Sequence, residues 1–140
     1  MLKILIPFDG SENSLRAVQY AAKTSQKNPS LEFDLLHVFD PVPVRAHAAL
    51  TQDEIRLLHA EDTNLLFEPA QRILDHASSK YTTHYRFGNP ASEIAAHVIE
   101  KGCDAVIMGT RGHGLIGGAV IGSVGTRVVH LVGVPVTLIK

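Results

Sequence analysis

The chain has 140 residues, a formal net charge of −1 and 19% charged residues, which predicts one folded domain over residues 1–140. Without a basic excess we expect no nucleic-acid partner, because neutralising a phosphate backbone needs clustered lysine and arginine. No apolar run approaches the ~18 residues of a membrane span, and the N-terminus lacks a signal-peptide pattern. We therefore expect a cytoplasmic protein with no membrane contact. The one cysteine, Cys103, excludes an internal disulfide and is expected to be buried.

Strand-like and helix-like segments alternate from the N-terminus onwards. Residues 2–8 form a nearly continuous apolar run, which is typical of a strand buried on both faces. Apolar residues within 14–25 have helical spacing, and Asn28 followed by proline ends that helix. Residues 31–39 predict the second strand, and 41–50 predict an irregular loop.

A long helix is expected next. Thr51 and Glu54 have the spacing of a capping box ahead of an apolar pattern. Pro69 lies inside this pattern and predicts a kink or a break near Glu68, because proline removes a helical hydrogen bond. Residues 81–87 then alternate as a third strand.

Clear start and stop signals surround the following helix. Asn89 is a plausible N-cap with Pro90 at the first helical position, and Gly102 is a suitable C-terminal stop after Lys101. The remaining expected elements are a strand over 105–108, a helix over about 123–131 and a last strand over 134–139.

This strand–helix alternation predicts an open α/β fold, with a five-stranded, mainly parallel sheet and helices on both faces, as in Rossmann-like domains. Pro135 indicates that the last strand lies at a sheet edge, because proline cannot donate to a ladder. An exposed apolar edge favours pairing with a second copy. We therefore expect a homodimer formed through the strand that begins at Val134 and ends at Ile139.

The glycines concentrate between the fourth strand and the helix after it. Ligands of open α/β sheets bind at the carboxyl ends of strands, and glycine lets backbone amides approach an anion. Ser123 begins a helix whose free N–H groups favour a phosphate. The segment is neither a Walker P-loop, since no Lys-Ser or Lys-Thr follows, nor the dinucleotide fingerprint, which follows the first strand. A loop without a ligand is the alternative.

The stretches MGTRGHG and GSVGTRVV resemble the universal stress protein family. Its ATP-binding members carry Gly, two residues, Gly, nine residues, then Gly and Ser or Thr. Gly109, Gly112, Gly122 and Ser123 match this pattern. LIPFDGSENS, LLHVFDP, GNPASEI and PVTLIK resemble further family motifs in the same order, so the resemblance spans the chain.

The resemblance implies a role for each matching position. Pro7, Val38 and Met108 would line an adenine pocket, and Asp9 would approach the ribose or a cation. From the residues alone, an Asx-turn or N-cap is the alternative for Asp9. The positions implied for the ribose and phosphates are Gly109, Gly112, Gly114, Gly122, Ser123 and Val124.

Within the glycine loop, Arg111 and His113 are candidate phosphate contacts, with plain solvent exposure as the alternative. Gly118 stands where the family often has a basic residue, and Gly125 should loosen the first helical turn by ~1 kcal/mol. AMP and cyclic AMP are therefore alternatives to ATP.

We expect no catalytic residue, because no general base has an evident partner, and at most a slow ATPase. The eight histidines have no helical i, i+4 pair, so no dedicated metal site is expected beyond Mg²⁺ carried with the nucleotide. The resemblance implies a nucleotide-binding switch in the stress response, acting through its dimer and a protein partner. A dimeric interaction module with a vestigial nucleotide loop is the alternative.

Overall fold

The computed structural model describes residues 2–39, 50–110 and 121–140. Strands and helices alternate through them, as the sequence predicts. The elements are β1 (Leu2–Pro7), α1 (Glu12–Lys27), β2 (Leu31–Phe39), α2 (Gln52–His76), β3 (Lys80–Phe87), α3 (Pro90–Lys101), β4 (Ala105–Gly109), α4 (Ser123–Leu131) and β5 (Val136–Ile139). The loop predicted at 41–50 lies, apart from Leu50, outside the described residues.

The five strands form one parallel sheet in the order β3-β2-β1-β4-β5, which confirms the predicted architecture. From β1 the chain adds β2 and β3 on one side, then crosses over to add β4 and β5 on the other. The carboxyl ends of β1 and β4 therefore form the topological switch point, where such sheets bind ligands.

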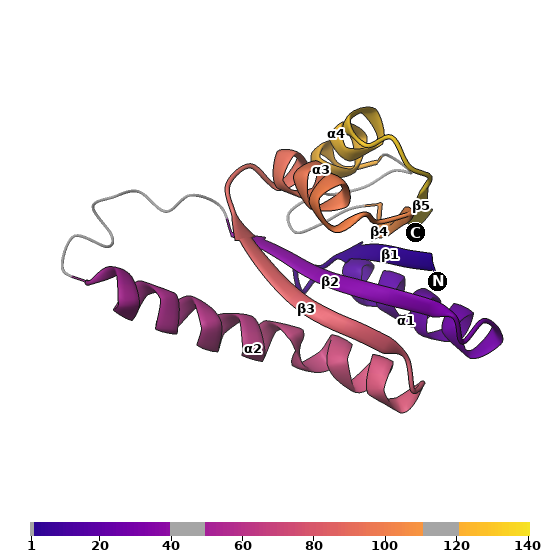
Figure 1. The fold of residues 1–140 in the computed structure, drawn as a ribbon, viewed down its shortest axis with the longest axis horizontal. Coiled ribbons are helices and arrows are strands. Elements are labelled where there is room, and N and C mark those ends of the chain that lie inside the picture. Colours follow the sequence, from indigo (N-terminus) through magenta and orange to yellow (C-terminus); the bar gives the residue numbers. More distant parts are fainter. Residues whose placement is uncertain (1, 40–49, 111–120) are drawn as a thin grey trace.

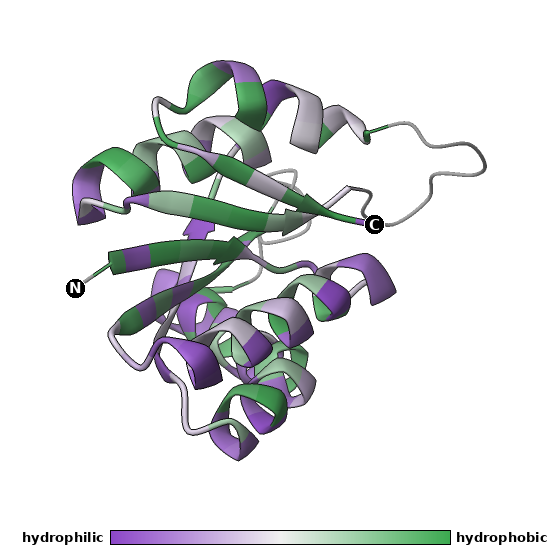
Figure 2. Cartoon of the chain, turned by 90° about the vertical axis from the view of Figure 1, so that its right-hand side faces the viewer, coloured by the Kyte–Doolittle hydropathy of each residue, from purple (hydrophilic) through white to green (hydrophobic). Residues whose placement is uncertain are grey.

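Helices cover both faces of the sheet, with α1 and α2 on one side and α3 and α4 on the other (Figure 1). Side chains alternate along each strand, so Ile6 of β1 packs toward α1 and α2 while Leu5 packs toward α3 and α4. Figure 2 shows the resulting pattern, with hydrophobic strands in the middle and hydrophilic stretches on the helices. Each fully buried large apolar side chain contributes roughly 1.5–3 kcal/mol.

The predicted helix boundaries are largely confirmed. The capping box at Thr51 and Glu54 has both of its hydrogen bonds. Asn89 caps α3 by accepting from the Ser92 N–H at 3.1 Å. Gly102 ends that helix in the left-handed conformation, with φ of 65°, which glycine adopts without strain.

Of the kink or break predicted near Glu68, the break is wrong, because α2 runs as one helix through Pro69. Phe67, Ala70 and Leu74 are buried on either side of the proline and pack into the core beneath the sheet. Tertiary packing thus offsets the lost hydrogen bond. Among the described helices, none is long and apolar enough to cross a membrane.

The edge position predicted for the last strand is confirmed, although β5 begins at Val136 rather than Val134. Pro135 still joins the ladder as an acceptor, since its carbonyl receives the Val106 N–H at 2.9 Å. Proline fits here because that bond requires only its carbonyl.

Candidate functional site

A cavity of about 430 Å³ opens at the topological switch point. Its wall comes from the carboxyl ends of β1, β2 and β4 and from the N-terminal turns of α3 and α4. Cavities of ~300–1,000 Å³ at such a position are typical of small-molecule sites. The predicted site residues that fall in the described part of the chain all line it: Pro7, Asp9, Val38, Met108, Gly109, Gly122, Ser123 and Val124.

One side of the cavity is apolar. Pro7, Val38 and Met108 come from three neighbouring strands, and the parallel arrangement brings their ends to one edge. Leu36 and Ile94 add further aliphatic surface. Such a wall suits a flat, weakly polar ring, because contact with it removes apolar surface from water.

Asp9 lies in the same wall, in the turn between β1 and α1. Its Oδ1 accepts the Ser11 N–H at 2.9 Å, so the Asx-turn named as an alternative is present. Ser11, rather than Asp9, is the N-cap of α1. The turn contact uses one carboxylate oxygen and holds the side chain at the cavity.

The opposite side of the cavity is the start of α4. Gly122 is the N-cap of this helix and provides no side-chain cap. Its own N–H donates to the Thr110 carbonyl at 2.6 Å, so this amide is engaged within the protein. The amides of Ser123 and Val124 lie in the first helical turn, where an α-helix has no internal acceptor for them. That turn is suited to bind an anion.

Two glycines of the wall have packing reasons that the sequence did not reveal. A Cβ on Gly109 would lie 2.8 Å from the Asn13 carbonyl carbon and oxygen, so β4 and α1 approach too closely for a side chain. A Cβ on Gly125 would lie 2.9 Å from Ile121 Cγ2. Gly125 is therefore a buried contact as well as a loosened helical position.

The family model for the universal stress protein family matches residues 1–140. The chain belongs to this family. A universal stress protein of Methanocaldococcus jannaschii, MJ0531, is 30% identical over 139 residues, which cover 99% of this chain and 81% of that protein.

Solved structures of the family share the fold. The structure of the hypothetical protein MJ0577 matches with a TM-score of 0.84 and 26% identity, over 99% of this chain and 95% of that one. A universal stress protein solved in complex with cAMP matches with a TM-score of 0.69 and 19% identity, over 99% and 96%. One from Archaeoglobus fulgidus solved with dAMP matches with a TM-score of 0.70 and 18% identity, over 100% and 98%.

Part of the family's glycine motif lies outside the described residues. This applies to the predicted contacts Arg111, Gly112, His113 and Gly114, and to Gly118. The described ends of the motif, Gly109 and the pair Gly122 and Ser123, face one cavity. Their roles as ligand contacts remain predictions.

His37 also lines the cavity, although it is not among the site residues predicted from the sequence. Its Nδ1 lies 2.8 Å from the Phe8 carbonyl, which can only accept, so Nδ1 carries the proton. In this tautomer Nε2 is an acceptor. The sequence signal that could have identified His37 is its position near the end of the predicted second strand, residues 31–39.

Cys103 is a free, buried cysteine, as predicted. Burial raises the pKa of its thiol to about 11. A reactive or redox-sensing cysteine needs a lowered pKa and access to solvent. The side chain therefore has neither property of a nucleophile.

Proposed function

We propose that this universal stress protein binds an adenine nucleotide in the 430 Å³ cavity, with ATP and Mg²⁺ first among the candidates. One observation carries the proposal: a single cavity joins an apolar wall from three strand ends to the N-terminal turn of α4. An adenine ring matches the first surface and a phosphate the second. The complexes of two family members with cAMP and dAMP, at 19% and 18% identity, are consistent with it.

Each end of the cavity has a distinct role in this proposal. Pro7, Val38 and Met108 contact the base, and Asp9 accepts a hydrogen bond from the ribose or approaches the cation. The amides of Ser123 and Val124 and the Ser123 hydroxyl donate to the phosphate nearest α4. The helix dipole contributes about 0.3–1 kcal/mol toward an anion there.

A second candidate is a nucleotide with one phosphate, AMP or cyclic AMP. The described residues of the cavity wall include neither lysine nor arginine. A single phosphate is well matched to one helix N-terminus, whereas a triphosphate needs further positive charge. If ATP is the ligand, Mg²⁺ and Arg111 supply that positive charge.

The proposed cellular role is a regulatory switch in the stress response that acts through a homodimer and a protein partner. Edge strand β5 pairs with its counterpart in a second copy, which removes an exposed sheet edge. Nucleotide binding slows amide hydrogen exchange in residues 41–50 and 109–122 and so changes the surface that the partner meets. Equal exchange with and without nucleotide would contradict the switch.

Calorimetric titration of nucleotide-stripped protein tests the binding site, using ATP with Mg²⁺, AMP and cyclic AMP in parallel. Gly122→Val places a branched side chain at the N-cap of α4, and we expect it to weaken binding at least tenfold. Gly133→Val makes the same chemical change past the C-terminal end of α4, where a Cβ has nothing within 4 Å. Affinity should persist in that control. Equal affinity in both variants, or no binding by the parent protein, would reject the proposal.

A further inference from the structure

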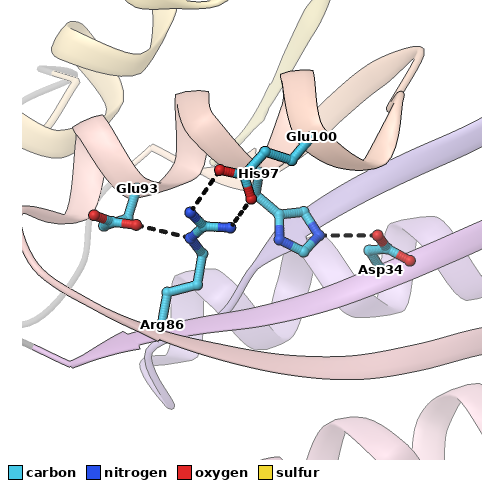
Figure 3. Close-up of polar contacts among 5 residues, drawn as sticks. All are labelled: Asp34, Arg86, Glu93, His97 and Glu100. Atoms are coloured by element: carbon cyan, nitrogen blue, oxygen red, sulfur yellow. Dashed lines mark hydrogen bonds and ion pairs between the residues drawn. The ribbon is translucent and has the colours of Figure 1, made fainter.

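A second cluster of polar side chains is buried between the sheet and α3. Asp34 lies in the middle of β2, His97 on α3 and Cys103 just after α3. Their relative exposures are 1%, 1% and 5%. Figure 3 shows the His97 ring pointing from the helix to the Asp34 carboxylate. Carboxylates are rarely buried to this extent unless paired, and Asp34 is paired with both His97 and His84.

The fold brings the three side chains together from distant parts of the sequence. Phe33 and Leu35 pack toward α1 and α2, so Asp34 between them faces α3. His97 is on the buried side of α3 with Ile94. The left-handed turn at Gly102 then reverses the chain, and the Cys103 N–H donates to the Val98 carbonyl at 3.0 Å.

The donor atoms are close enough to share one ion. An Asp34 oxygen, a His97 nitrogen and the Cys103 sulfur all lie within 4.8 Å of one another, and Nε2 of His97 is 2.9 Å from Oδ2 of Asp34. A tetrahedral zinc ion with bonds of about 2.0–2.3 Å separates its ligand atoms by roughly 3.3–3.8 Å. Shifts of about 1 Å therefore convert the cluster into a coordination shell.

A further nitrogen donor contacts the other oxygen of this carboxylate, outside the group of three whose donor atoms lie within 4.8 Å of one another. Nε2 of His84, on β3, lies 3.4 Å from Oδ1 of Asp34, and its ring is 4.8 Å from the ring of His97. Among the described residues, Lys3 and Lys101 act electrostatically on this cluster, and Arg86 nearby is engaged by Glu93 at 2.7 Å and Glu100 at 2.8 Å (Figure 3). The two carboxylates compensate the charge of Arg86.

We propose that Asp34, His97 and Cys103 form a buried transition-metal site, with His84 as the fourth ligand and Zn²⁺ as the preferred ion. Oxygen, nitrogen and sulfur donors together match zinc rather than Mg²⁺ or Ca²⁺. One carboxylate, one thiolate and two neutral imidazoles balance the charge of Zn²⁺. A neutral assembly avoids the large cost of burying an unpaired charge.

The ion displaces the thiol proton, because the thiolate is the ligand. The site is distinct from the nucleotide cavity, since neither Asp34, His97 nor Cys103 lines that cavity. It joins β2, β3 and the end of α3. Metal binding therefore stabilises the fold independently of nucleotide.

Cobalt titration of the reduced, metal-free protein tests this proposal. Co²⁺ is added to the folded protein and, in a second arm, is present during refolding, since the ligands are buried. We expect one equivalent to bind with a thiolate-to-cobalt charge-transfer band and tetrahedral visible bands, both removed by Zn²⁺. The chain has one cysteine, so a thiolate band identifies Cys103 as a ligand.

Two variants complete the test. Cys103→Ala should abolish the band and lower affinity at least a hundredfold, with folding checked by circular dichroism. His76→Asn changes an exposed histidine outside the cluster and should bind as the parent does. No thiolate band in either arm would overturn the proposal. Cobalt binding of equal affinity in Cys103→Ala would also overturn it, because other side chains would then hold the ion.

Discussion

Replacing Gly109 by alanine is expected to destabilise the fold in the absence of any ligand. The new Cβ would lie 2.8 Å from the carbonyl carbon and oxygen of Asn13 and 2.9 Å from its Cβ. Optimal carbon–carbon contacts are about 3.5–4.0 Å, so β4 and α1 must separate locally by roughly 0.7–1.2 Å. Backbone atoms cannot rotate away, and α1 is held by buried Ala17, Val18 and Ala21.

Overpacking of this kind costs about 1–3 kcal/mol of unfolding free energy. Urea denaturation of nucleotide-free protein measures it as a lower midpoint with an unchanged slope. Gly133→Ala is the matched control, because a Cβ there has nothing within 4 Å, and its stability should stay within about 0.5 kcal/mol of the parent. If Gly109→Ala is as stable as the parent, the close approach of β4 and α1 is not a constraint, and the packing argument fails.

Three further predictions concern the polar contacts. In metal-free buffer, His97→Ala should lower the unfolding free energy by about 3 kcal/mol, because it removes the 2.9 Å partner of the buried Asp34 carboxylate. A loss of unfolding free energy below about 1 kcal/mol in urea denaturation would contradict this prediction. Asn89→Ala should cost about 1 kcal/mol through loss of the α3 N-cap, and an unchanged denaturation midpoint would refute the cap's contribution. Burial and the hydrogen bond to Asp75 raise the pKa of Tyr81 from 10.0 to about 12. A raised folded pKa contributes stability that is present below about pH 10 and lost as the pH rises toward 12, so the parent should lose stability over that window more steeply than Tyr81→Phe.

The parts of the fold that depend on local sequence could be predicted. Several of these features act through backbone groups close to the residue itself. They are the N-caps at Thr51 and Asn89, the helix stop at Gly102 and the edge-strand signal at Pro135. The strand–helix alternation then allows few topologies, since crossovers between parallel strands have one hand. Pro69 does not break α2, because buried contacts of this helix outweigh the local preference.

The candidate site was predictable for a related reason. Pro7, Val38 and Met108 are far apart in the sequence, but strand ends of a parallel sheet meet at one edge. No comparable rule predicts from sequence which residues of a helix contact which residues of the sheet. The closeness of Gly109 to α1 depends on how a helix docks on the sheet. The pairing of Asp34 with His97 joins residues 63 positions apart, and no sequence spacing encodes it.

Nucleotide binding in this cavity is tested by a map of amide chemical shifts during titration with AMP and with ATP and Mg²⁺. Saturable changes are expected to concentrate at residues 8–9, 36–39 and 122–125, which are part of the cavity wall. Changes of this kind would locate the base against the strand ends and the phosphate against α4. Saturable changes centred elsewhere, or no change with either nucleotide, would contradict nucleotide binding in this cavity.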